Sequence, residues 1–132
     1  MILSVVMLVL PYELKREEWK VNEFIKTITP DIVTLTTYKA VVGETDSTPL
    51  VTATGFKINP NNARRHRIIA VSRDLKRKWG MNSKVRIVGA GKYDGTYYVR
   101  DLMNSRYRKR IDILISDKDK QTKLKKIKVY KL

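Results

Sequence analysis

Short runs rich in β-branched and aromatic residues follow one another after residue 30, and Gly, Pro, Asn, Asp and Ser cluster between them. Several of these runs alternate apolar with polar residues, as strands with one buried face do. The predicted strands are residues 32–38, 51–56, 67–71, 85–90, 97–101, 110–115 and 125–132, of which 51–56 also fits a turn. This pattern predicts a mainly β domain, a small closed barrel with short helical insertions.

Two helices are predicted inside this β pattern. Ser72 is suited to begin a helix over residues 73–79, with Asp74 in its first turn and Gly80 just beyond its end. Ser116 and Asp119 form a plausible capping pair for a second helix over residues 117–124. A third helix, over residues 13–29, precedes the strands, because its apolar residues recur at helical spacing until Pro30.

The N-terminal apolar run of residues 2–10 begins at Ile2 and ends at Leu10. It is about half as long as the ~20 residues of a membrane-spanning helix, and it has the size of a signal-peptide core without the basic residues that precede one. It is either a signal, an anchor or an apolar arm docked on the domain. We therefore divide the chain into an N-terminal segment, 1–30, and a barrel domain, 31–132, and we expect an exported protein of the cell envelope.

The excess of positive charge indicates a negatively charged partner. The chain has 28 Lys and Arg against 13 Asp and Glu, a formal net charge of +15. Nucleic acid, an anionic lipid surface and an acidic cell-wall polymer all suit such a surplus. The sequence has no cysteine and a single histidine, His66, so disulfides and Cys/His metal clusters are excluded. We expect a monomer that needs no metal or cofactor.

Two predicted strands each carry an aspartate, Asp101 after Tyr98-Val99-Arg100 and Asp112 inside Ile111-Asp112-Ile113. Aspartate is disfavoured in strands, and its burial costs free energy unless it is paired, hydrogen-bonded or protonated. One interpretation is that Asp112 points outward and pairs with Arg108 or Arg110. The other is that Asp112 lines a groove as a carboxyl group able to give and take a proton.

Five segments carry a resemblance to a known family. In order they read TTYKAV, TATGF, RIIAVSRDL, KVRIVGAGKYDGTYYVRDL and KRIDILI. From residue 34 to residue 132 the chain resembles the Asp-Asp-Asp (3D) domain, a double-psi β-barrel similar to the catalytic domain of membrane-bound lytic transglycosylase A. The resemblance implies a six-stranded double-psi β-barrel, with Asp101 and Asp112 as the second and third aspartates of the family.

The chain departs from the family pattern at two places. Ser72 stands where the first aspartate is expected, and Asp74 follows two residues later. The DTGG sequence that usually follows the second aspartate is replaced by Leu102-Met103-Asn104-Ser105. Asp74 either serves only the start of its helix, the interpretation that we favour, or reaches the same groove from a shifted position.

The resemblance implies that Asp112 protonates a glycosidic oxygen of peptidoglycan and that Asp101 positions it or stabilises developing positive charge. The sugar's own 6-hydroxyl would then attack the anomeric carbon. Candidate substrate contacts are Tyr38, Thr54, Asp74, Arg108 and Arg110. Tyr97, Tyr98 and Tyr107 are candidates to stack on sugar rings, although packing is the commoner role for such residues.

Three functions from different classes remain open. The first is a peptidoglycan-cleaving enzyme related to lytic transglycosylases, and the second is a non-catalytic module that binds wall glycan. The third is a basic nucleic-acid-binding domain, because Tyr107 lies within the basic residues 106–110.

Overall fold

The structure is a computed structural model that describes residues 20, 28–40 and 50–132. The apolar run 2–10, nearly all of the predicted helix 13–29 and residues 41–49 lie outside the described residues. In the described part of the chain, no helix is both long and apolar enough to cross a membrane.

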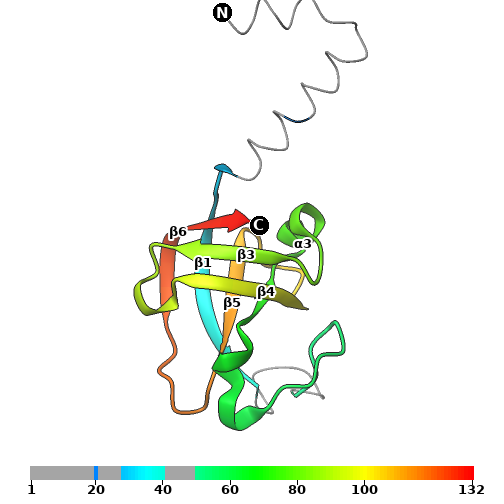
Figure 1. Cartoon of the computed structure of the whole chain (residues 1–132), viewed down its shortest axis with the longest axis vertical. Coiled ribbons are helices and arrows are strands. Elements are labelled where there is room, and N and C mark those ends of the chain that lie inside the picture. Colours follow the sequence, from blue (N-terminus) through cyan, green and yellow to red (C-terminus); the bar gives the residue numbers. More distant parts are fainter. Residues whose placement is uncertain (1–19, 21–27, 41–49) are drawn as a thin grey trace, which may run out of the picture.

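Six strands form a closed barrel in the order β1-β5-β2-β4-β3-β6 (Figure 1). Their bounds are β1 Asp31–Lys39, β2 Ile68–Val71, β3 Lys84–Val88, β4 Gly95–Leu102, β5 Arg110–Ile115 and β6 Lys123–Lys131. Among the described residues, two short 3-10 helices, η1 Pro60–His66 and η2 Gly91–Tyr93, and one α-helix, α3 Arg73–Trp79, connect them. The helix predicted after Ser72 is therefore confirmed.

The two halves of the barrel have the same topology. β1 pairs in parallel with β5, β2 pairs in parallel with β4, and all other neighbours are antiparallel. Exchanging the first three strands with the last three reproduces both the strand order and the direction of every pair. Two interlocked parallel pairs of this kind form a double-psi β-barrel, and the predicted fold class is confirmed.

The barrel interior holds the main core. Alternate residues of the strands point inward and are buried, among them Leu35, Ile69, Val85, Val99 and Ile113. A smaller apolar cluster lies on the outside of the wall, where residues 50–66 cover part of β1, β5 and β2. We call it the outer cluster, and its buried members are Tyr38, Ala40, Ile58, Ala63, Ile68, Ala70, Met103 and Leu114.

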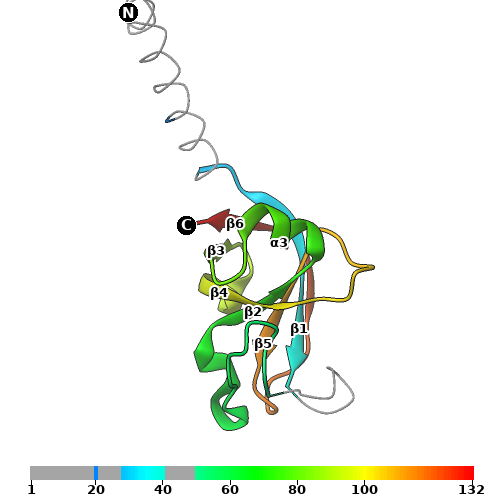
Figure 2. The same cartoon turned by 90° about the vertical axis from the view of Figure 1, so that its right-hand side faces the viewer.

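The ends of the barrel differ. Figures 1 and 2 show α3 at the end where β1 begins and β6 finishes, and η1 at the opposite end. The end of α3 is held to β1 because Trp79 Nε1 donates a hydrogen bond of 2.9 Å to Asp31 Oδ2.

The helix predicted over residues 117–124 is wrong. The Ser116 N–H donates to Asp119 Oδ2, and the Asp119 N–H donates to the Ser116 carbonyl, so the expected capping pair closes a tight turn instead. β6 then begins at Lys123, where it pairs with Thr36 of β1. Pairing with β1 outweighs the weak local preference for a helix.

Residues 51–56 and η1 both lie between β1 and β2. Residues 51–56 form a loop held by an isolated bridge between Val51 and Lys57, so the turn interpretation is the correct one. Residues 59–62 include the start of η1, for which Asn59 acts as the cap by accepting a hydrogen bond from Asn61 N.

Candidate functional site

Asp101 faces the outside of the barrel because β4 contains a bulge. Ile69 pairs with Val99, but the next residue of β2, Ala70, pairs with Asp101, so Arg100 is the extra residue. Without the bulge, Asp101 would point inward with Tyr97 and Val99, which are buried in the core. The bulge therefore brings the carboxylate of Asp101 to the outer face.

Asp112 reaches the same face through ordinary alternation along β5. Ile111, Ile113 and Ile115 point into the core, while Asp112 and Leu114 point outward. The hydroxyl of Thr36, in register with Asp112 on β1, donates a hydrogen bond of 2.9 Å to Asp112 Oδ1. Asp112 thus points outward, as one interpretation of the sequence required, and the neighbouring hydroxyl contacts its carboxylate.

Ala70 lies between the two aspartates. It pairs with Asp101 on one side and with Asp112 on the other. Two strand spacings, roughly 10 Å, therefore separate the two aspartate Cα atoms. Ala70 is itself buried, as a member of the outer cluster.

Tyr38 joins the two aspartates electrostatically. Its hydroxyl donates a hydrogen bond of 3.2 Å to Asp101 Oδ2. Burial raises the pKa of Tyr38 well above its usual range, and the negative charges of Asp101 and Asp112 raise it further. Tyr38 is only 8% exposed, so it is a neutral hydrogen-bond donor at physiological pH that lies close to both carboxylates.

Residues 52–56 complete the surroundings of Asp101. Its Oδ1 accepts hydrogen bonds from the Ala53 and Leu102 N–H groups, both at 3.0 Å. The Thr54 N–H donates to the Arg100 carbonyl, and the Thr54 hydroxyl contacts that of Thr52 at 3.0 Å. The structure therefore brings the loop that carries Thr54 against β4, directly beside Asp101.

Asp74 has a different environment. Its Oδ2 accepts a hydrogen bond of 3.0 Å from the Lys109 N–H, and the Ser72 hydroxyl accepts one of 3.1 Å from the Arg110 N–H. Burial raises the pKa of Asp74, but hydrogen bonds from Ser72 and from the Lys109 and Leu75 backbone outweigh burial, so the pKa is lowered overall. Ser72 and Asp74 together hold the start of β5, and neither Asp101 nor Asp112 contributes to this shift.

The basic loop before β5 lies beside the site. The Arg110 guanidinium stacks on the Tyr107 ring at 4.4 Å, and its Nε donates to the Thr36 hydroxyl at 3.4 Å. Arg110 is thus connected to Asp112 through Thr36. Arg108 is exposed on the loop.

The three tyrosines considered for sugar stacking differ in accessibility. Tyr97 is fully buried in the barrel core, so it has the packing role that is the commoner one and cannot stack on a sugar ring. The Arg100 and Lys84 cations lie over the Tyr98 ring, at 5.0 and 5.7 Å from its centre. Tyr107 packs against the outer cluster, with cations over its ring, and is the one of the three nearest to Arg110.

Sequence reasoning missed Thr36 and Ala70. Thr36 occurs in a predicted strand among other threonines, and only its register with Asp112 distinguishes it. Ala70 has no reactive group, and its place between the aspartates depends on the order β5-β2-β4. A small residue in an otherwise β-branched buried strand was the one available signal.

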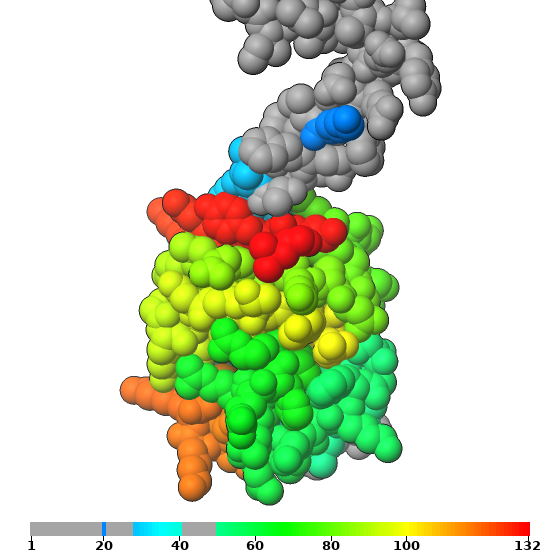
Figure 3. All heavy atoms as spheres, viewed as in Figure 1, coloured from blue at the N-terminus to red at the C-terminus, as the bar shows by residue number. Residues whose placement is uncertain are grey.

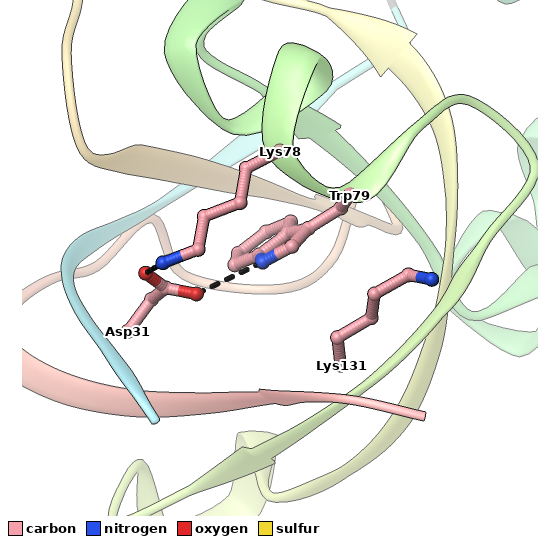
Figure 4. Close-up of a pocket in the computed structure, with 4 residues that line it drawn as sticks. All are labelled: Asp31, Lys78, Trp79 and Lys131. Atoms are coloured by element: carbon pink, nitrogen blue, oxygen red, sulfur yellow. Dashed lines mark hydrogen bonds and ion pairs between the residues drawn. The ribbon is translucent and has the colours of Figure 1, made fainter. Parts of the chain in front are cut away.

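A pocket of about 140 Å³ lies at the other end of β1, lined by Asp31, Lys78, Trp79 and Lys131 (Figure 4). Lys78 Nζ is 2.5 Å from Asp31 Oδ1, so both carboxylate oxygens of Asp31 are used by α3. The pocket is well below the roughly 300–1,000 Å³ of typical ligand sites. We interpret it as a packing feature of the α3 contact.

No model of a known protein family matches the chain, and no curated protein is significantly similar to it.

Proposed function

We propose that this protein binds the glycan strands of peptidoglycan at the cell envelope and cleaves them with Asp112 as the acid. One observation supports this most strongly: Asp101 and Asp112 flank Ala70 on one face of the barrel, and the neutral hydroxyl of Tyr38 lies close to both. A pair of carboxyl groups on one face is the kind of arrangement that acts on a glycosidic bond.

In the proposed reaction the Asp112 carboxyl group transfers its proton to the glycosidic oxygen as the bond from C1 to that oxygen breaks. The 6-hydroxyl of the same sugar then attacks C1 and returns its proton to the Asp112 carboxylate. The reaction forms a 1,6-anhydro sugar end and regenerates the acid. Thr36, which donates to Asp112 Oδ1, holds the carboxyl group in one orientation.

Asp101 has a separate part in this proposal. Three donors, the Tyr38 hydroxyl and the Ala53 and Leu102 N–H groups, point at its carboxylate. A carboxylate fixed in this way is suited to stabilise positive charge at the anomeric carbon, or to accept hydrogen bonds from sugar hydroxyls, without itself transferring a proton.

Positively charged residues at the edge of the site suit an acidic substrate. Arg108 and Arg110 lie on or next to the β4–β5 connection, and the stem peptides of peptidoglycan carry carboxylates. Their contribution would be to binding rather than to bond cleavage.

A second candidate, a module that binds wall glycan without cleaving it, is favoured by one observation. Ser72 has no carboxylate, and that of Asp74 accepts a hydrogen bond from the Lys109 N–H, so neither residue supplies a third carboxylate beside Asp101 and Asp112. The nucleic-acid alternative has less support, because Arg106 and Arg110 already cover the Tyr107 ring on which a base would stack.

Incubation of the full chain with purified peptidoglycan separates these candidates. Mass spectrometry of the soluble products should detect fragments that end in 1,6-anhydromuramyl residues. Sedimentation with insoluble peptidoglycan in the same samples reports binding. Binding without new fragments would favour the second candidate over the enzyme.

A further inference from the structure

A second face of the barrel is strongly basic. The strands β3 and β6 together contain seven Lys and Arg, two in β3 and five in β6, and no Asp or Glu. We call their solvent-facing side the basic face. Its cations are Lys84, Arg86, Lys123, Lys125, Lys126, Lys128 and Lys131, all exposed. Two ion pairs of the described residues, Lys78 with Asp31 and Arg64 with Asp119, involve none of these cations.

Local geometry increases the charge density of this face. Val33 pairs with Ile127 and Leu35 pairs with Leu124, so β6 has a bulge at Lys125 and Lys126. Lys126 has a φ of 58°, in the left-handed region. The bulge turns two consecutive lysines to solvent, where strict alternation would have buried one of them.

Exposed aliphatic side chains lie among these cations. Ile32 on β1 pairs with Lys128 on β6, which pairs with Val88 on β3, so the three residues form one row across the face. Ile32 is 48% exposed and Val88 is 37% exposed. At the other end of the β3–β6 pair, the exposed Leu132 donates its N–H to the Lys84 carbonyl.

The basic face lies away from the two aspartates. In the ring β1-β5-β2-β4-β3-β6, the strand opposite β6 is β2, which carries Ala70 between Asp101 and Asp112. Figure 3 shows the red atoms of β6 beside the yellow-green atoms of β3 on one surface of the molecule. A large body on this surface would leave the carboxylate face open.

We propose that the basic face docks on the surface of an anionic lipid bilayer. The cations match the negative headgroups, and the row of Ile32, Lys128 and Val88 sets aliphatic groups at the depth where headgroups give way to acyl chains. Nucleic acid fits this face less well, because the Tyr98 ring beside it is occupied by Arg100 and Lys84 and does not offer a free stacking surface.

Flotation of the full chain with lipid vesicles tests this proposal. The probes are vesicles of phosphatidylcholine alone and of phosphatidylcholine mixed with phosphatidylglycerol. One variant is Lys84→Gln, Arg86→Gln and Lys128→Gln. Its matched control is Arg65→Gln, Arg77→Gln and Lys118→Gln, which removes the same charge from exposed residues elsewhere.

Wild type should bind the anionic vesicles, and the basic-face variant should bind them roughly 10²-fold more weakly, since each cation near such a surface contributes about a factor of five. The control variant should stay within a few-fold of wild type, and high salt should weaken wild-type binding. The pair Ile32→Thr and Val88→Thr should weaken vesicle binding several-fold without changing binding to a single-stranded oligonucleotide.

Three outcomes would overturn the proposal. Equal losses in the basic-face and control variants would show that net charge alone is responsible. Equal binding of all proteins to both kinds of vesicle would assign the interaction to another part of the chain. A loss of oligonucleotide binding in the basic-face variant with vesicle binding unchanged would identify a nucleic-acid surface instead.

Discussion

The hydroxyl of Tyr38, on β1, donates a hydrogen bond of 3.2 Å to Oδ2 of Asp101, on β4, although β5 and β2 lie between these strands in the barrel. This contact crosses the outer face above Ala70 and connects residues 63 positions apart. The negative charge of Asp112 also acts on the Tyr38 hydroxyl. Tyr38 is therefore a neutral donor in the candidate site, bonded to Asp101 and influenced by Asp112.

Tyr38→Phe removes this donor and leaves the ring in place. Asp101 keeps its hydrogen bonds from Ala53 and Leu102, so we expect a loss of about 1 kcal/mol in the free energy of unfolding at neutral pH. Urea unfolding followed by circular dichroism measures this value. A loss of more than about 3 kcal/mol would mean that the outer cluster collapses without the hydroxyl.

The stability of Tyr38→Phe should also differ from that of wild type at alkaline pH. The pKa of Tyr38 is raised in the folded protein, so the unfolded chain gives up this proton more readily. Stability from the neutral hydroxyl is complete below the ordinary pKa of 10.0 and is lost as pH rises toward the folded pKa. Between about pH 10 and 11, Tyr38→Phe should therefore lose less stability than wild type does.

Asp74→Asn tests whether Asp74 is structural. Asparagine accepts a weaker hydrogen bond from the Lys109 N–H, so we expect a loss of about 1 kcal/mol in the free energy of unfolding at pH 7, with binding to peptidoglycan unchanged. Because the folded pKa lies below the ordinary 3.8, the stabilisation is present above about pH 4 and is lost as pH falls through the folded pKa. The difference between the two proteins should therefore shrink below about pH 3. Loss of glycan binding at unchanged stability would instead assign Asp74 to the site.

Gly95→Ala tests the packing of Arg67. A Cβ at Gly95 would lie 2.3 Å from Arg67 Nη2, and the φ of 134° is unfavourable for alanine. Arg67 cannot move without loss, because its guanidinium stacks on Tyr97 at 4.1 Å and donates to the carbonyls of Thr96 and Asp94. We expect thermal unfolding to show a cost of about 2–3 kcal/mol.

Gly89→Ala is the matched control for this change. Gly89 has a φ of 89°, but no heavy atom lies within 4 Å of its Cβ position. It should show the backbone cost alone, about 1–2 kcal/mol. Equal losses at the two glycines would mean that Arg67 moves freely and does not fasten the β3–β4 turn.

Asp31→Ala tests the contact between α3 and β1. Trp79 is 4% exposed, so removal of the carboxylate leaves its indole N–H buried without this acceptor. We expect a loss of about 2 kcal/mol in urea unfolding, and a smaller loss for Asp31→Asn, whose amide oxygen still accepts from Trp79. Equal losses in the two variants would instead attribute the effect to the ion pair with the exposed Lys78.

Much of the fold follows from local patterns. The alternation in β3 and β5 and the helix between Ser72 and Gly80 are as predicted, because each depends on residues close together in sequence. The prediction of a helix at residues 117–124 is wrong because the end of this segment pairs with β1 as a strand. Such pairing depends on residues far apart in the sequence.

The candidate site was predictable only in part. The two strand aspartates were evident in the sequence, and so was Tyr38 as a possible contact. The outward direction of the Asp101 side chain was not evident in the sequence, because it depends on a bulge at Arg100 that no local sequence pattern indicates. Simple alternation along the strand would place Asp101 on the same side as the buried Val99. The role of Ala70 likewise required the strand order.

The central claim, that Asp112 supplies the proton for glycan cleavage, is tested most directly by mass spectrometry of purified peptidoglycan after incubation with wild type, Asp112→Asn and Asp117→Asn. Asp117 is exposed in the β5–β6 turn, so its variant controls for loss of one negative charge. We expect wild type and Asp117→Asn to release 1,6-anhydromuramyl products, and Asp112→Asn to form them at least ~10²-fold more slowly with its fold intact. Wild type and Asp112→Asn that both bind peptidoglycan and are equally inert on it would contradict the enzyme proposal.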